Sequence, residues 1–301
     1  MKALVPYDAW SVGPDLPEGL AVAVYPGGEP TVPVDDVEVY VLPYMAGPEP
    51  GRLIARLPSL RFLQTLTAGV DDVRPLVPDG VTLCNARGVH DASTAELVVA
   101  LVLASQRGIP DFVRDAQHGR WAGDRRESLA DSTVLVVGYG SVGNAVEARL
   151  TPFECTVRRV ARTARDGVAG FEDLPALLPE ADVVVLTVPM TDETRAMVDA
   201  GFLAAMKDGA LLVNVSRGAV VVTDDLVAAV STGRLRAALD VTDPEPLPPD
   251  HVLWSLPGVL VSPHVGGNTS AFLPRAQRLV FDQLRRYVAG EPLRNVITAA
   301  Y

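Results

Sequence analysis

Three apolar segments of the chain end in polar side chains that could do chemistry together. They are Arg217 after ALLVNVS, Asp240 and Glu245 in AALDVTDPEP, and His264 in VLVSPHVGG. If these segments are parallel strands of one sheet, their carboxyl ends meet at the edge where doubly wound sheets bind ligands. A guanidinium, carboxylates and an imidazole at that edge are side-chain types that a hydride transfer requires.

A glycine run with the spacing G-x-G-x-x-G lies upstream in VLVVGYGSVGNAVEARL (134–150). It follows an apolar strand and opens an alanine-rich helical pattern, which is the setting of a dinucleotide pyrophosphate site. There Gly138 permits the tight turn, Gly140 lets the backbone approach the pyrophosphate, and Gly143 lets the helix pack closely on the strand. Amides at the helix N-terminus then face the phosphates. The run therefore predicts dinucleotide binding.

The residues at the end of the next predicted strand, in TVRRVARTAR (156–165), distinguish an NAD(H) site from an NADP(H) site. An NAD site normally places an acidic residue roughly 20 residues after the glycines, where it accepts the ribose 2′-hydroxyl. Here the strand ends in Ala161-Arg162-Thr163, with Arg165 just beyond and no acid. A guanidinium suits a 2′-phosphate, because its fork matches phosphate oxygens. We predict a preference for NADP(H); the alternative is NAD(H) bound without the acid, with these arginines at the solvated surface.

Two strand–helix series must position these groups. Up to about residue 90, short apolar segments alternate with helical stretches, which predicts a small α/β unit with a parallel sheet: KALVP, VAVY, EVYVLPY, LRFLQTLT and VTLCN. From residue 134, six further strands predict a doubly wound parallel sheet: VLVVG, TVRRVA, VVVLTVP, ALLVNVS, AALDV and VLVSPH. Two long helical patterns stand outside them. One spans 93–108 with Ser93 or Thr94 as its N-cap, and the other spans about 270–289 and ends at Gly290.

Composition narrows the possible partners. The net charge of −11 argues against a nucleic acid or an anionic membrane as partner. Cys84 and Cys155 have no metal-site spacing and form no disulfide framework. No stretch reaches 18 apolar residues, and MKALVPYDAW has no segment of signal-peptide length. We expect a cytoplasmic protein that binds small molecules and no metal.

Taken together, the motifs resemble the D-isomer-specific 2-hydroxyacid dehydrogenases, which include glyoxylate/hydroxypyruvate reductases, D-3-phosphoglycerate dehydrogenases, formate dehydrogenases and D-lactate dehydrogenases. The succession VNVSRG, DVxxxEP and PHxGG carries the resemblance most specifically, and LQTLTAGVDD, TAELVVALVLA and LTVPMTDETRAMV extend it over nearly the whole chain. The resemblance implies two α/β lobes. A Rossmann cofactor domain would span 92–270, and a smaller flavodoxin-like substrate domain would comprise 1–91 and 271–301.

The resemblance also implies roles for the polar strand-end residues. Arg217 would clamp the carboxylate and carbonyl oxygen of the substrate with charged hydrogen bonds. His264 would be the general acid in reduction and the base in oxidation, and Glu245 would pair with it and favour its protonated form. Asp240 would contact the nicotinamide end of the cofactor.

Further contacts are implied for the cofactor and the substrate. The predicted cofactor-binding residues are Gly138, Tyr139, Gly140, Ser141, Val142, Gly143, Arg162, Thr163, Arg165, Val188, Pro189, Thr194, Val215, Ser216, Asp240, Gly266 and Gly267. The amides of Gly69 and Val70 would hold the substrate carboxylate, and Tyr44 and Met45 in VLPYMAG would line the substrate pocket or pack in the core.

The implied reaction is reduction of a small 2-oxo acid to the D-2-hydroxy acid, with glyoxylate or hydroxypyruvate favoured if the pocket is compact. The alternatives are a phosphoglycerate- or formate-type dehydrogenase on the same scaffold, or a dinucleotide-sensing, corepressor-like binding protein. Two departures from the family pattern stand out: Thr242 replaces the usual aromatic residue, and residues 67–71 lack the lysine of phosphite-oxidising members. The family further implies a homodimer through the cofactor domain, with region 93–125 reaching across near Trp121.

Overall fold

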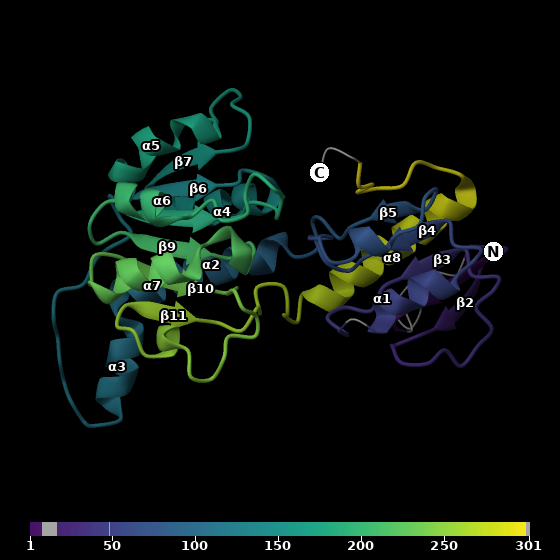
Figure 1. The fold of residues 1–301 in the computed structure, drawn as a ribbon, viewed down its shortest axis with the longest axis horizontal. Helices are drawn as coiled ribbons and strands as arrows, with labels where there is room; N and C mark the ends of the chain where they lie inside the picture. The colour runs from purple at the N-terminus through teal and green to yellow at the C-terminus, as the bar shows by residue number, and fades with distance from the viewer. Residues whose placement is uncertain (8–16, 48, 299–301) are drawn as a thin grey trace. The chain divides into compact units, whose positions relative to one another are not determined.

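The computed structural model describes residues 1–7, 17–47 and 49–298, and it divides into two compact units (Figure 1). Unit 1 comprises Met1–His90 and Ser270–Tyr301, and unit 2 comprises Asp91–Thr269. The chain therefore passes between the units twice. Both passages lie one residue before the boundaries expected from the sequence.

Unit 1 is built on a five-stranded parallel sheet in the order β2-β1-β3-β4-β5. This is the flavodoxin-like order that the resemblance implies. The strands are β1 (Lys2–Val5), β2 (Ala21–Val24), β3 (Val39–Val41), β4 (Phe62–Gln64) and β5 (Thr82–Cys84), and each overlaps a segment predicted as a strand. Helix α8 (Phe272–Ala289) packs on one face through Ala276, Val280 and Leu284. Helix α1 (Glu49–Leu53) and the turn 54–56 contribute Leu53 and Ile54 to the second core cluster.

Unit 2 contains the predicted doubly wound sheet, with six parallel strands in the order β11-β10-β9-β8-β6-β7. The strands are β6 (Thr133–Val137), β7 (Thr156–Val160), β8 (Val183–Leu186), β9 (Leu211–Asn214), β10 (Arg236–Leu239) and β11 (Val259–Val261). A single parallel bridge, Val160 with Ala169, occupies the place of a further strand beyond β7. With that bridge counted, the order is the Rossmann order, and it reverses between β6 and β8.

Both faces of this sheet are covered, as a parallel sheet requires. Helices α2 (Asp91–Arg107) and α4 (Ser141–Leu150) share one core cluster with Val134 and Val136 of β6. The alternate residues Leu135 and Val137 face the opposite cluster. That second layer contains α5 (Leu174–Leu177), α6 (Ala200–Ala205) and α7 (Thr223–Ser231). All four residues of β8 are completely buried.

The predicted start of α2 is wrong. The helix begins at Asp91, so Ser93 and Thr94 lie inside it and neither is the N-cap. Ser93 Oγ instead hydrogen-bonds to Thr269 Oγ1 at 2.8 Å, a partner 176 positions away in the chain. The other predicted end is confirmed, because α8 stops at Ala289 and Gly290 adopts a left-handed φ of 67°.

A short helix, α3 (Ile109–Ala116), follows α2 and contains no buried residue. Its side chains Ile109, Phe112 and Val113 are exposed, and the Trp121 side chain beyond it is completely exposed. No helix in the described part of the chain combines the length and apolar character needed to cross a bilayer.

Candidate active site

The polar residues singled out in the sequence follow three neighbouring strands of unit 2. Arg217 lies three residues after β9, Asp240 follows β10 directly, and His264 lies three residues after β11. These strands are adjacent in the sheet and parallel, so all three residues leave it at the carboxyl edge. The sheet thereby gathers the predicted catalytic side chains at one site.

His264 and Glu245 form a direct pair. The His264 Nδ1 to Glu245 Oε1 distance is 2.5 Å. The hydrogen bond to Glu245 raises the pKa of His264 above its ordinary value, against the opposing effects of burial and of the Arg217 charge. The same bond lowers the pKa of Glu245. Because Nδ1 is held by the carboxylate, Nε2 is the ring atom through which His264 can exchange a proton with a ligand.

Asp240 positions the loop that carries His264. It is only 3% exposed, and its Oδ1 accepts hydrogen bonds from Ser262 Oγ at 2.6 Å and the Val265 amide at 2.9 Å. Its Oδ2 accepts from the Gly266 amide at 2.9 Å, and the His264 amide donates to its backbone carbonyl at 2.8 Å. His264 itself has a left-handed φ of 52°. Asp240 therefore holds the His264 loop, and its expected contact to the nicotinamide end of the cofactor stays a prediction.

Arg217 is fixed by a loop that depends on Asn214. The Asn214 side-chain amide donates to the Arg217 carbonyl at 2.9 Å, and its Oδ1 accepts from the amide and hydroxyl of Ser216. The charge of Arg217 acts to lower the pKa of both Glu245 and His264, although Glu245 keeps the pKa of His264 raised overall. Arg217 therefore acts electrostatically on the same pair. Sequence reasoning gave no role to Asn214, although it stands in the VNVSRG motif.

Gly218 allows the Arg217 loop to pack against the Glu245 loop. A Cβ at Gly218 would lie 1.9 Å from the carbonyl oxygen of Thr242, which no side chain could tolerate. The Thr242 hydroxyl donates to the Pro244 carbonyl at 2.9 Å. The residue that departs from the family pattern thus makes a bond of its own within the loop that carries Glu245.

The glycine run has the geometry expected of a phosphate-binding turn. Gly138 has a φ of 105°, and a Cβ there would lie 2.5 Å from the Val188 amide nitrogen. A Cβ at Gly143 would lie 2.6 Å from the Gly138 carbonyl oxygen, so only glycine lets α4 approach β6 this closely. Nothing lies within 4 Å of a Cβ at Gly140. This open backbone before the N-terminus of α4 fits a pyrophosphate.

The segment after β7 carries arginines and no acid. Arg162, Thr163 and Arg165 are all exposed. Arg165 Nη2 donates to the Tyr139 carbonyl at 2.7 Å, which ties this segment to the glycine run. These residues could hold a phosphate on the ribose 2′-oxygen.

Two predicted cofactor residues have hydroxyls engaged inside the protein. Thr194 is 3% exposed, and its Oγ1 donates to the Pro189 carbonyl at 2.6 Å and accepts from the Thr191 amide at 2.9 Å. The hydroxyl of Ser216, a residue 6% exposed, donates to Asn214 Oδ1. Both therefore shape the loops after β8 and β9.

The remaining predicted cofactor residues also follow strands at this edge. Ser141 and Val142 open α4, Val188 and Pro189 follow β8, Val215 follows β9, and Gly266 and Gly267 follow His264. Val188 is buried and Pro189 is exposed. Among the described residues, no group of three His, Cys, Asp or Glu side chains is arranged to hold a metal ion.

The predicted substrate residues lie in unit 1, also after strands. In the described part of this unit, neither the Gly69 nor the Val70 amide donates a backbone hydrogen bond; Gly69 is partly exposed and Val70 is only 1% exposed. Tyr44 packs in an aromatic cluster, with its ring centroid 4.2 Å from that of Phe272 and 5.4 Å from that of His90. Met45 is 55% exposed. Tyr44 therefore has a packing role, and Met45 offers the freer side chain.

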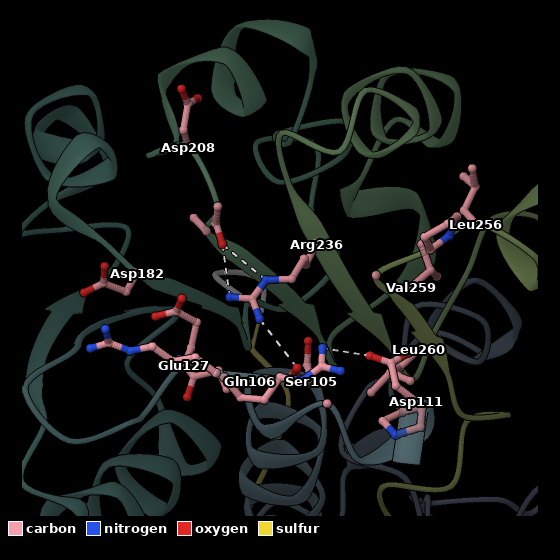
Figure 2. A pocket seen from close by; sticks show the side chains of 18 of the residues that line it. Ser105, Gln106, Asp111, Glu127, Asp182, Asp208, Arg236, Leu256, Val259 and Leu260 are labelled. Atoms are coloured by element: carbon pink, nitrogen blue, oxygen red, sulfur yellow. Dashed lines mark hydrogen bonds and ion pairs between the residues drawn. The ribbon is translucent and has the colours of Figure 1, made fainter. Parts of the chain in front are cut away.

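A cavity of about 920 Å³ lies at the opposite edge of the unit 2 sheet (Figure 2). Its lining residues Asp182, Ala210 and Val259 stand at or before the starts of their strands, and so does Arg236. Arg236 donates to the Gly209 carbonyl from Nε and Nη2. The cavity is separate from the carboxyl edge and is lined by none of the predicted catalytic, cofactor-binding or substrate-binding residues.

Comparisons with known proteins agree with this geometry. Residues 99–266 match the family model described as "D-isomer specific 2-hydroxyacid dehydrogenase, NAD binding domain". The chain is 35% identical over 251 residues to the glyoxylate reductase/hydroxypyruvate reductase of Mus musculus, covering 78% of this chain and 76% of that protein. It is also 31% identical over 260 residues to the D-3-phosphoglycerate dehydrogenase of Methanocaldococcus jannaschii, covering 81% of this chain and 49% of that protein.

A solved structure is similar over the full length. The NADPH-dependent glyoxylate/hydroxypyruvate reductase of Sinorhizobium meliloti, in complex with NADP and sulfate, superposes with a TM-score of 0.85 at 25% identity. The match covers 100% of this chain and 99% of that chain. The chain accordingly belongs to the D-isomer specific 2-hydroxyacid dehydrogenase family and is an NAD(P)-dependent oxidoreductase.

Proposed function

We propose that the protein uses NADPH to reduce a small 2-oxo acid, glyoxylate or hydroxypyruvate, to the D-2-hydroxy acid. The observation that carries the proposal is the His264–Glu245 pair next to Arg217 at the carboxyl edge of the sheet. A protonated imidazole beside a fixed cation is suited to a substrate that has a carboxylate and gains a proton on its carbonyl oxygen.

Each residue has a defined task in this reaction. The bound cofactor supplies the hydride that reaches the carbonyl carbon. Arg217 binds the substrate carboxylate and carbonyl oxygen, and its charge stabilises the negative charge that develops on that oxygen. His264 then delivers the proton from Nε2 to the same oxygen. Glu245 keeps the ring protonated and oriented through Nδ1.

We further propose that residues of unit 1 also contact the substrate. The unused amides of Gly69 and Val70 are two donors suited to a carboxylate. Met45, exposed after β3, would contact the substrate side chain. The names of two relatives, both glyoxylate/hydroxypyruvate reductases, support a substrate with a small group on the 2-oxo carbon.

The preference for NADPH rests on the segment after β7. Arg162 and Arg165 stand there in place of the acid that would accept a 2′-hydroxyl and repel a 2′-phosphate. A dianionic phosphate gains charged hydrogen bonds from guanidinium groups, whereas an unmodified ribose does not. NADH would still bind through the glycine run, but more weakly.

We also propose that the protein is a cytoplasmic homodimer. The exposed apolar side chains of α3, together with Trp121, form a surface that a second copy of the chain would cover. The free thiols of Cys84 and Cys155 suit a reducing compartment. Sedimentation of the purified protein at twice the mass of one chain is the expected result, and a monomer would refute the dimer.

A substrate panel tests the proposed activity. Consumption of NADPH and NADH is followed in parallel with glyoxylate, hydroxypyruvate, pyruvate, phenylpyruvate and 3-phosphohydroxypyruvate. We expect the highest kcat/KM with NADPH and one of the first two acids. Activity confined to 3-phosphohydroxypyruvate would instead indicate a phosphoglycerate-type enzyme. Tight dinucleotide binding without turnover of any acid would favour the binding-protein alternative.

A further inference from the structure

The ring of Tyr139, the residue between the first two glycines of the run, lies close to two arginines. The Arg159 guanidinium carbon is 5.5 Å from the ring centroid, and that of Arg165 is 6.0 Å from it. Both distances are within the range of a cation–π contact. Arg165 also donates to the Tyr139 carbonyl at 2.7 Å. A single aromatic residue thus contacts a strand arginine and a loop arginine at once.

Glu147 of α4 binds both Tyr139 and Arg159. Its carboxylate accepts from Arg159 Nε at 2.9 Å and from the Tyr139 hydroxyl. The Glu147 side chain is only 14% exposed, and its pKa is lowered chiefly by the hydrogen bonds from Arg159. It is therefore a carboxylate at neutral pH, and it neutralises Arg159 while it holds the tyrosine ring in place.

The same network fixes the loop that carries Arg165. Arg159 Nη1 donates to the Gly167 carbonyl at 3.4 Å. Arg165 and Val168 exchange two backbone hydrogen bonds, of 2.9 and 2.8 Å, which close the loop into a tight turn. Arg165 is exposed, yet its guanidinium is held at the glycine run from two directions. A flexible side chain so fixed loses less conformational entropy when it binds a ligand.

We propose that Glu147 and Tyr139 are positioning residues for the recognition of a ribose 2′-phosphate. They hold Arg165 beside the glycine run, and they keep the Arg159 charge paired within the protein, so that Arg165 and the exposed Arg162 meet the phosphate. This inference rests on the proposed preference for NADPH. Glu147 of α4 would thus influence the choice between NADPH and NADH without touching the phosphate itself.

The binding of nucleotide fragments measures the contribution of the 2′-phosphate to affinity without any catalytic step. Titration calorimetry gives the Kd of 2′,5′-ADP and of 5′-AMP, which differ only in that phosphate. For Tyr139→Leu we expect the Kd of 2′,5′-ADP to rise about tenfold, because a stacking contact and a charged positioning contact are lost together. For Glu147→Gln we expect about fivefold, because the charged hydrogen bonds that hold Arg159 and the Tyr139 hydroxyl are weakened. For Tyr139→Phe, which keeps the ring, we expect about twofold. The Kd of 5′-AMP should rise far less than that of 2′,5′-ADP in all three.

Arg158→Ala is the matched control, because Arg158 precedes Arg159 on β7 and is exposed on the opposite side of the strand. It should leave both dissociation constants as they are. Tyr139→Phe and the 5′-AMP titration also guard against misfolding, since a disordered glycine run would weaken both ligands equally. An equal loss for the two ligands would therefore overturn the positioning role.

Two further outcomes separate this inference from the proposal on which it rests. If the parent binds 2′,5′-ADP no better than 5′-AMP, the NADPH preference and the positioning role both fail. If the parent prefers 2′,5′-ADP and Arg165→Ala abolishes that preference, but Tyr139→Leu and Glu147→Gln retain it, the positioning role alone is overturned. Loss of the preference in all three variants would support both.

Discussion

Replacing Glu245 by glutamine removes one negative charge from the catalytic pair and changes little else. Glutamine has nearly the same shape, and its side-chain oxygen can still accept the hydrogen bond from His264 Nδ1. The glutamate holds the pKa of His264 above its ordinary value, so the variant histidine should lose its proton at a lower pH. Reduction needs that proton, and the decline of its rate with rising pH should therefore begin earlier.

The size of the effect follows from the exposure of the pair. A hydrogen bond to a charged group contributes roughly 1.5–3 kcal/mol to the protonated state. The side chains of His264 and Glu245 are 36% and 41% exposed, so solvent screening reduces the value to just below this range, about 1.4 kcal/mol. That corresponds to about tenfold in rate where the parent histidine is protonated and the variant histidine is not.

The assay is the pH profile of kcat/KM for 2-oxo acid reduction, followed by nicotinamide absorbance. Below the pKa of both enzymes the profiles of parent and Glu245→Gln should converge, because His264 is protonated in each. With rising pH the variant should fall first. A constant ratio of the two rates at every pH would refute the reasoning, because it would mean that Glu245 acts only on geometry.

Three further variants test other parts of the site. His264→Ala should lower kcat by about 10²–10⁴-fold, the usual contribution of a general acid, while the Kd of NADPH stays constant; unchanged turnover would exclude the acid role. Arg162→Ala should raise the KM of NADPH far more than that of NADH, and equal changes would contradict the 2′-phosphate assignment. Gly218→Ala should lower the free energy of unfolding by about 3 kcal/mol, because its Cβ would lie 1.9 Å from the Thr242 carbonyl oxygen. Gly123→Ala, where a Cβ meets open space, is the control measured beside it by denaturant titration.

The strands, and the meeting of Arg217, Glu245 and His264 at one edge, could be predicted because their signals are local. Each strand is a short apolar run, and Arg217, Glu245 and His264 stand in motifs at or just beyond strand ends. Parallel pairing then brings them together without any further information. The glycine run was predictable for the same reason, since a turn at Gly138 and close packing at Gly143 follow from the residue type.

The contacts that hold these groups could not be predicted, because they join distant segments. Ser93 looked like an N-cap, yet its hydroxyl bonds to Thr269 and the helix begins earlier, at Asp91. Asp240 was given only a cofactor contact, and its bonds to the loop around His264 were not foreseen. In both cases the hydrogen bonds join residues far apart in the sequence, so a pattern along the chain does not indicate them.

Isotope transfer tests the central claim most directly. Hydroxypyruvate is reduced with NADPH deuterated at C4 of the nicotinamide, and the glycerate formed is analysed for deuterium at C2 and for configuration. The account predicts D-glycerate with deuterium at C2 from the parent, and only trace product from His264→Ala. L-glycerate would contradict the predicted configuration of the product. Product without deuterium at C2 would contradict hydride transfer from the nicotinamide.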